Sequence, residues 1–202
     1  MASAQLLLAS ASPRRSALLD QLGIRHQIHP AELHEEPHEL ELPDHYVQRL
    51  AAEKSLAAQT QTRTSLPVLG ADTEVVLDGE IFGKPEDEDH AHSMLKKLSG
   101  REHFVLSAVS LRHGDQHWAL LSVSQVLFRP LEDHEIQAYW RTGEPIGKAG
   151  AYAIQGLGSL FIERLAGSFS GVMGLPLRET STLLKQVGIN PLLNQKDPTV
   201  GE

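Results

Sequence analysis

Residues 5–15 read QLLLASASPRR, which predicts a strand that runs directly into a helix. The continuous apolar run up to Ala9 is typical of a buried strand, and the serines and proline that follow end it. Pro13 suits the first turn of a helix, and Ser12 before it is a competent N-cap. Leucines on one face then carry the helix as far as Gly23. A strand joined to a helix in this way is typical of α/β proteins.

Strands and helices alternate along the rest of the chain. Besides a strand at residues 5–10 and a helix at 13–22, the pattern predicts strands over residues 25–29, 68–69, 75–77, 81–82, 103–112, 118–129 and 159–165, and helices over residues 45–59, 87–98, 132–142 and 176–187. The predicted fold class is therefore α/β, with a mixed, twisted β-sheet flanked by helices. We expect residues 1–190 to form a single domain, which two lobes around a cleft could build, and residues 191–202 to be a C-terminal tail.

The composition excludes several classes of protein. The 202 residues carry 18 basic and 26 acidic side chains, so the formal net charge is 18 − 26 = −8. An acidic chain argues against a nucleic acid polymer as partner but leaves room for a small phosphate ligand. The absence of cysteine excludes disulfide scaffolds, thiol catalysis and Cys-ligated zinc. The apolar run at residues 6–9 is too short to span a membrane and follows no basic segment, so we expect a cytoplasmic protein with no membrane partner.

Short motifs that resemble known sites fail on their context. Residues 34–38 read HEEPH, the pattern of a zinc protease, but Pro37 would break the helix on which such a site depends. Residues 79–84 and 143–148 are each one residue short of a phosphate-binding P-loop, and neither is followed by Ser or Thr. Residues 156–158 read GLG but precede a strand, so they predict a tight turn and no dinucleotide site.

The junction between the first strand and the first helix has the chemistry of a phosphate site. A helix N-terminus presents free N–H groups and the positive end of the helix dipole. Ser10, Arg14 and Arg15 add donors there, and two cations at a helix N-terminus require a compensating anion. Asp72 follows a short buried strand, and ligands of open α/β sheets bind at strand ends. The alternatives are two solvated arginines and an Asp that only forms a turn.

Several segments in a fixed order carry a resemblance to one family. The matching segments lie at residues 7–23, 49–54, 70–73, 83–85, 94–100, 148–156 and 174–180. They resemble the Maf family of nucleoside triphosphate pyrophosphatases, whose fold is related to that of inosine-triphosphatase-like enzymes. The resemblance spans residues 5–187. The segment AYAIQG at residues 151–156 is similar to the branch of the family that acts on dTTP and UTP.

The resemblance implies an enzyme that hydrolyses dTTP and UTP, and also modified pyrimidine nucleotides, to the monophosphate and pyrophosphate, and so limits incorporation of non-standard nucleotides. It implies that Asp72 accepts a proton from the attacking water. Asp72 and Glu35 would hold a divalent metal, for which we expect Mg²⁺, with Mn²⁺ and Co²⁺ as alternatives. The side chains implied to bind the triphosphate are Ser10, Arg14, Arg15, Lys54 and Lys84, and those implied to set the base preference are Arg14, Thr73 and Gln155. The resemblance also implies a cytoplasmic protein that often forms a homodimer.

Two other functions use similar residues. A nucleotide-binding regulator of cell division and septum formation would need the same Arg and Lys side chains but neither Asp72 nor Glu35. A third hypothesis is an enzyme of the same fold that removes purine triphosphates. Both carboxylates are present, which favours an enzyme, and Gln155 favours uracil or thymine because its amide can donate to O4 and accept from N3–H. The sequence leaves open whether Asp72 acts mainly as a base or as a metal ligand.

Overall fold

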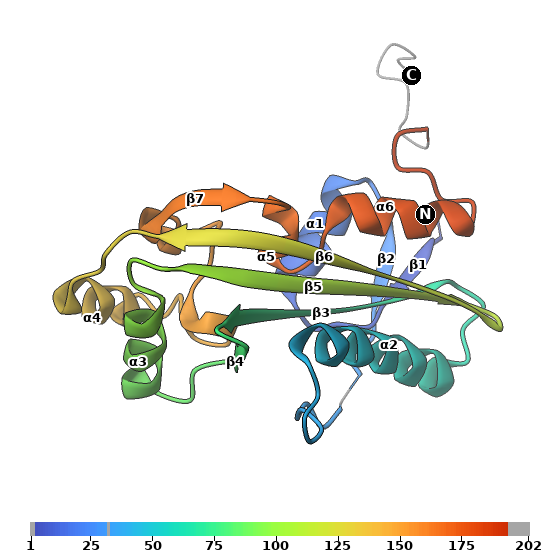
Figure 1. Cartoon of the computed structure of the whole chain (residues 1–202). Helices are drawn as coiled ribbons and strands as arrows, with labels where there is room; N and C mark the ends of the chain where they lie inside the picture. The colour runs from blue at the N-terminus through green and yellow to red at the C-terminus, as the bar shows by residue number, and fades with distance from the viewer. Residues whose placement is uncertain (1–2, 32, 194–202) are drawn as a thin grey trace, which may run out of the picture.

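A computed structural model describes residues 3–31 and 33–193, and in this part of the chain seven strands form one sheet. The strands are β1 (Leu6–Leu8), β2 (His26–Ile28), β3 (Val68–Leu77), β4 (Glu80–Phe82), β5 (Glu102–His113), β6 (Gln116–Phe128) and β7 (Ile162–Ala166). Their order is β2-β1-β3-β5-β6-β7, and β4 also pairs with β3 (Figure 1). β1 pairs in parallel with β2 and β3, whereas the other pairs are antiparallel.

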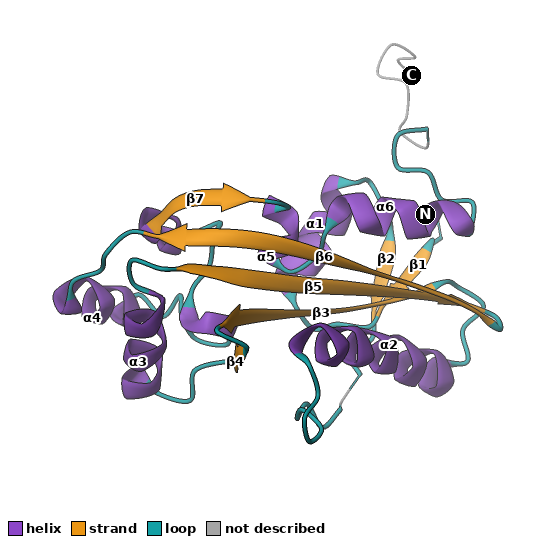
Figure 2. Cartoon of the chain, in the orientation of Figure 1, coloured by secondary structure: helices purple, strands orange, loops and turns teal. Residues whose placement is uncertain are grey.

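Helices cover both faces of this sheet. They are α1 (Pro13–Gln21), α2 (Pro43–Thr62), α3 (Glu88–Leu98), α4 (Asp133–Arg141), α5 (Phe169–Met173) and α6 (Leu177–Gln186), with short 3₁₀ helices η1 (Ala149–Ala151) and η2 (Leu157–Phe161). α2 lies on one face, α5 and α6 lie on the other, and α3 and α4 pack together at one end (Figure 1, Figure 2). The predicted α/β class with a mixed sheet is confirmed. None of the described helices is long and apolar enough to cross a bilayer.

The structure corrects three local predictions. Asp72 was expected at the end of a short strand, but it lies in the middle of β3, which pairs with β5 without interruption from Val68 to Val76. The Ser12 side chain does not cap α1; instead, the Ser12 N–H donates to Ser10 Oγ at 3.2 Å. The strand predicted over residues 159–165 begins only at Ile162, because η2 precedes it.

Two further predictions are confirmed, and one concerns residues that lie mostly outside the described part of the chain. Residues 33–38 contain no helix, which confirms that the HEEPH motif is a loop. Residues 156–158 lie in a turn and the start of η2, as predicted for a tight turn. Most of the predicted C-terminal tail, residues 194–202, lies outside the described residues. The sequence pattern gave no prediction for α5 or η1.

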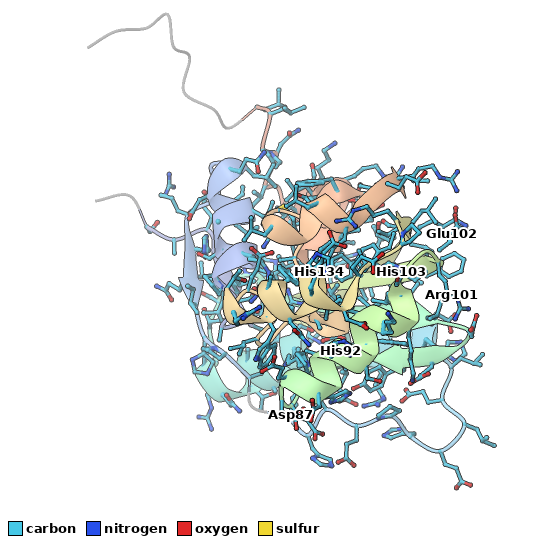
Figure 3. All side chains as sticks on the ribbon, turned by 90° about the vertical axis from the view of Figure 1, so that its left-hand side faces the viewer. Asp87, His92, Arg101, Glu102, His103 and His134 are labelled. Carbon is cyan, nitrogen blue, oxygen red and sulfur yellow. The ribbon has the colours of Figure 1, made fainter. Side chains whose placement is uncertain are left out.

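The core consists of two large apolar clusters on the same sheet. One packs α1 and α6 against β1, β3 and β5. The other packs α3 and α4 against the far ends of β3, β5 and β6, and Figure 3 views the molecule from this end. His103 is fully buried there, with Nε2 2.9 Å from the Tyr152 hydroxyl and its ring edge-on to Phe128. Burial lowers the pKa of His103 to about 4, so the ring is neutral at pH 7.

Helix α2 approaches β3 very closely at Gly70. A Cβ placed on Gly70 would lie 2.3 Å from the carbonyl oxygen of Ala51 and 2.7 Å from the backbone nitrogen of Ser55. No side chain fits between the two backbones at this point, so only glycine permits the contact. Lys54 lies on the same face of α2 as these two residues, because positions three and four apart on a helix are neighbours.

We predict that Gly70→Ala lowers the free energy of unfolding by about 3 kcal/mol, because the added methyl group must push α2 away from β3. Gly83→Ala is the control, since a Cβ on Gly83 meets no atom within 4 Å. Urea unfolding followed by circular dichroism measures both variants. Equal unfolding midpoints for the two would contradict the tight contact.

The buried His103 predicts a loss of stability on acidification. The unfolded state binds a proton near pH 6.5 and the folded state only near pH 4, so stability falls as the pH drops between these values. The loss has an upper bound of about 3 kcal/mol. His103→Gln keeps a polar partner for Tyr152 and removes this titration. Melting temperatures at pH 7 and pH 5 should therefore differ less for the variant than for the wild type, and identical differences would contradict the assignment.

Candidate active site

One edge of β3 is left unpaired over a short stretch. Its parallel pairing with β1 ends at Leu69, and its antiparallel pairing with β4 begins at Val75. Residues 70–74 therefore have no strand partner on this edge within the described chain. Because successive side chains of a strand point to opposite faces, side chains from both faces of β3 reach the gap. The gap is the position that the chain leaves open for a ligand.

A cavity of about 640 Å³ occupies this gap, within the usual size range of a small-molecule site. Its walls come from the β1–α1 junction, the loop before α2, α2 itself, β3, the segment after β4, and two later segments around residues 147–155 and 172–174. The structure brings together every side chain that the sequence assigned to the site: Ser10, Arg14, Arg15, Glu35, Lys54, Asp72, Thr73, Lys84 and Gln155. Their individual roles stay predictions.

A buried lysine joins two carboxylates at the floor of the cavity. Lys54 Nζ lies 2.6 Å from Asp72 Oδ1 and 2.9 Å from Glu35 Oε1. Lys54 and Asp72 are 7% and 4% exposed, so bulk water screens their interaction very little. Burial alone would raise the pKa of Glu35, but the hydrogen bond and charge of Lys54, with the charge of Lys84, lower it below its usual range. Both carboxylates face the cavity next to a fixed positive charge.

Arg15 connects three separate segments at the opposite wall. Its Nε donates to the Gly174 carbonyl at 2.8 Å, and its terminal nitrogens reach Ser10 Oγ at 3.1 Å and Thr73 Oγ1 at 3.5 Å. Arg14 Nε donates to the Met173 carbonyl at 3.2 Å. The planar guanidinium suits this use because it presents several donors in a fixed geometry. Arg15 therefore holds the wall in place as well as lending it positive charge.

The cavity also contains charged residues that the sequence analysis did not assign. Glu74 lies two residues beyond Asp72 on the same face of β3, and burial together with the charge of Asp72 raises its pKa to about 8. Lys148 lines the cavity near Arg14, and its Nζ donates to the Ile146 carbonyl at 2.9 Å. Signals for both existed: the alternation of a strand places Glu74 beside Asp72, and Lys148 begins the family-like segment at residues 148–156.

The charge of the cavity is opposite to that of the protein. Five cationic side chains line it against three carboxyl groups, whereas the whole chain has a net charge of −8. The cationic residues are Arg14, Arg15, Lys54, Lys84 and Lys148. Several positive charges concentrated in a cavity attract a ligand that carries several negative charges. The electrostatics therefore fit a polyphosphate.

The carboxylates also fit a divalent cation. Asp72 Oδ2 is buried without a hydrogen-bond partner in the described structure, and Glu35 lies beside Asp72 because both contact Lys54 Nζ. Mg²⁺ prefers oxygen ligands and usually binds through one or two carboxylates together with substrate phosphates. No three His, Asp or Glu side chains among the described residues form a ligand cluster of their own. The donor set therefore suits a metal whose coordination a phosphate ligand completes.

Comparison with known proteins places the chain in a family. A family model described as Maf-like protein matches residues 5–187. The chain belongs to the Maf family. It is 56% identical to a dTTP/UTP pyrophosphatase of Methylococcus capsulatus over 92% of both chains. It is 49% identical to a nucleoside triphosphate pyrophosphatase of Haemophilus ducreyi, with 93% of this chain and 98% of the relative covered.

Among solved structures, this Maf protein is similar to a nucleoside-triphosphatase / dITP/XTP pyrophosphatase from Mycobacterium abscessus. The identity is 15% and the TM-score is 0.43, with 93% of this chain and 95% of that chain covered. A similarity of this size says nothing about the substrate. Membership of the Maf family therefore rests on the sequence.

The buried ion pair predicts that Lys54→Met lowers the free energy of unfolding by roughly 3 kcal/mol, because Asp72 would keep a buried charge without its cation. Lys84→Met is the matched control. Lys84 Nζ lies 3.7 Å from Glu35 Oε2 and its side chain is 65% exposed, so this pair is worth less than about 1 kcal/mol. Urea midpoints at pH 7 compare the two variants, and a larger loss for Lys84→Met would refute the ranking.

Proposed function

We propose that this Maf protein is a nucleoside triphosphate pyrophosphatase that hydrolyses dTTP and UTP, and modified pyrimidine analogues of them, to the monophosphate and pyrophosphate. The observation that carries the proposal is the buried Lys54–Asp72 pair beside four further cations in one cavity. Relatives 56% and 47% identical bear the name dTTP/UTP pyrophosphatase, which supports the same reaction. Removal of such triphosphates would limit incorporation of non-standard nucleotides.

In this proposal Asp72 acts on the attacking water, and the cationic side chains act on the pyrophosphate leaving group. Lys54 holds Asp72 through Oδ1, which leaves Oδ2 for one of two roles: to accept a proton from water or to bind the cation. The cationic side chains would stabilise the charge that develops on the pyrophosphate leaving group. A divalent cation, Mg²⁺ or alternatively Mn²⁺ or Co²⁺, would be held by Asp72 and Glu35. It would neutralise phosphate charge and lower the pKa of a bound water.

The base preference is assigned to Gln155 with Thr73 and Arg14. A glutamine amide donates to O4 of uracil or thymine and accepts from N3–H. A site built to pair polar groups rejects ligands that leave them unpaired, and such discrimination reaches roughly 10⁴-fold. Cytosine is the difficult competitor, because half a turn of the amide would satisfy it as well. Rejection of CTP therefore requires that the amide is held in one orientation.

Two implications of family membership stay predictions. A homodimer would double the mass found by sedimentation velocity, and a cytoplasmic location would be found by cell fractionation. A regulator of septum formation without catalysis is the competing function, and it would bind triphosphates without turnover.

We predict that UTP and dTTP with Mg²⁺ yield only monophosphate and pyrophosphate, and that Asp72→Asn lowers kcat by about 10³-fold or more. Asn keeps the shape of the side chain but loses the charge that accepts a proton, an interaction realised mainly in the transition state. Anion-exchange chromatography identifies the products, and calorimetry measures UTP binding to the variant.

Arg112→Ala is the control for this assay, because Arg112 is outside the cavity and contacts Ser55 on α2. Diphosphate and orthophosphate as products would rule out the proposed cleavage. UTP binding without turnover by the wild type would support the regulator instead. A wild-type rate in a folded Asp72→Asn would exclude Asp72 as the base.

A further inference from the structure

The side chain of Gln155 is not held by a hydrogen bond to any residue that the structure describes. It is exposed at the cavity wall, in the turn between η1 and η2. Its neighbours Ala153 and Ile154 are buried. The place from which the amide enters the cavity therefore depends on how firmly the backbone of this turn is held.

A single carboxylate holds the backbone after Gln155. Glu144 Oε2 accepts from the Leu157 N–H at 2.9 Å, and Oε1 accepts from the Gly158 N–H at the same distance. Oε1 also accepts from the Tyr139 hydroxyl at 2.7 Å. A carboxylate is suited to this position because it is acceptor-only, whereas an amide would present two donors.

The same pair of residues also holds the backbone before Gln155. The Tyr139 hydroxyl, which donates to Glu144, accepts from the Ala153 N–H at 3.1 Å. Gln155 is therefore flanked on both sides by amides tied to one Tyr–Glu pair. Tyr139 is 4% exposed and packs edge-on to Phe161 in the core, so the pair is anchored to the rigid part of the molecule.

The glycine next to Gln155 shows how closely the turn lies on this carboxylate. A Cβ on Gly156 would lie 2.2 Å from Glu144 Oε2. The turn thus rests directly on the carboxylate, with no space for a side chain between them. Burial alone would raise the pKa of Glu144, but the hydrogen bonds from Tyr139, Gly158 and Leu157 lower it, so the group is ionised and its hydrogen bonds are strong.

We propose that Glu144 is a positioning residue for base selection: with Tyr139 it fixes the turn that carries Gln155, and so determines which pyrimidine the amide accepts. The inference rests on the proposed function, because it assumes that Gln155 reads the base. Glu144 does not touch the nucleotide in this scheme. Its effect is to fix the point from which the amide of Gln155 reaches O4 and N3–H of the base.

The test measures the ratio of kcat/KM for UTP to that for CTP. Glu144→Gln should lower this ratio by roughly 10-fold. The NH₂ group of the new glutamine would face N–H and O–H donors that the carboxylate accepts from, and the lost hydrogen bonds would free the turn. Tyr139→Phe, which keeps the ring in the core and removes the hydroxyl, should lower the ratio in the same direction. Hydrogen exchange at Leu157 and Gly158 should be faster in Glu144→Gln than in the wild type.

Two controls separate positioning from a general loss of stability. Glu135→Gln removes another structural carboxylate, which pairs with Arg129 and the start of α4, and should lower the melting temperature without changing the ratio. In a Gln155→Ala background, Glu144→Gln should leave the ratio unchanged, because a residue that acts through Gln155 has no effect once Gln155 is gone.

Each outcome bears on the inference. The inference is overturned if the ratio is unchanged in both Glu144→Gln and Tyr139→Phe. It is also overturned if Glu144→Gln lowers the ratio equally with and without Gln155, or if the wild type shows no preference for UTP over CTP. A wild type that hydrolyses neither nucleotide would refute the proposed function, and calorimetric affinities for UTP and CTP would then replace kcat/KM in the same variants. Equal affinity ratios in wild type and Glu144→Gln would overturn the positioning role independently.

Discussion

The arrangement of this protein depends on the direct contact between the backbone of α2 and β3 at Gly70. Ala51, Lys54 and Ser55 share one face of α2, so the contact at Gly70 sets both the height and the rotation of the helix over the strand. Two residues along the strand on the same face, Asp72 meets Lys54 at 2.6 Å. If α2 lay farther from β3, Lys54 and Asp72 would remain buried but would no longer form an ion pair. The active geometry is therefore a consequence of main-chain packing.

The unpaired edge of β3 then gives this pair access to a ligand. β1 and β4 occupy the same edge on either side of residues 70–74, which leaves an opening in a sheet that is otherwise continuous. Asp72 reaches the opening from one face and Thr73 from the other, where Arg15 ties Thr73 to Ser10 and Gly174. A polyphosphate in this opening would meet cations from four different parts of the chain, while the base would meet the turn that Glu144 supports.

The sequence predicted the α/β class, and it singled out Ser10 and Arg14 because both lie at the junction of β1 and α1. The sequence pattern alone did not single out Lys54 or Gln155, which the family resemblance added and which line the same cavity. It failed at the centre of β3. Gly70, Asp72 and Thr73 interrupt the apolar pattern, so one strand of ten residues was predicted as two short ones. The interruption lies at the candidate site, and functional sites are where local rules are most often broken. Because residues 70–74 were not predicted as strand, Glu74 was missed as well. Glu144 was missed because its hydrogen bonds to Tyr139, Leu157 and Gly158 follow no local sequence pattern.

The contacts of Arg14 and Arg15 with Met173 and Gly174 join parts of the chain that are 159 residues apart. During synthesis, the first strand and helix leave the ribosome long before the segment that completes their wall is made. Contacts between residues far apart in the sequence form late in folding, because the chain loses entropy on closing the loop before the contact can stabilise it. A nascent chain that has not reached Met173 therefore contains Glu35, Asp72 and all five cations of the cavity, but it lacks the segment that Arg14 and Arg15 contact. The cavity is complete only after residues 172–174 have been made.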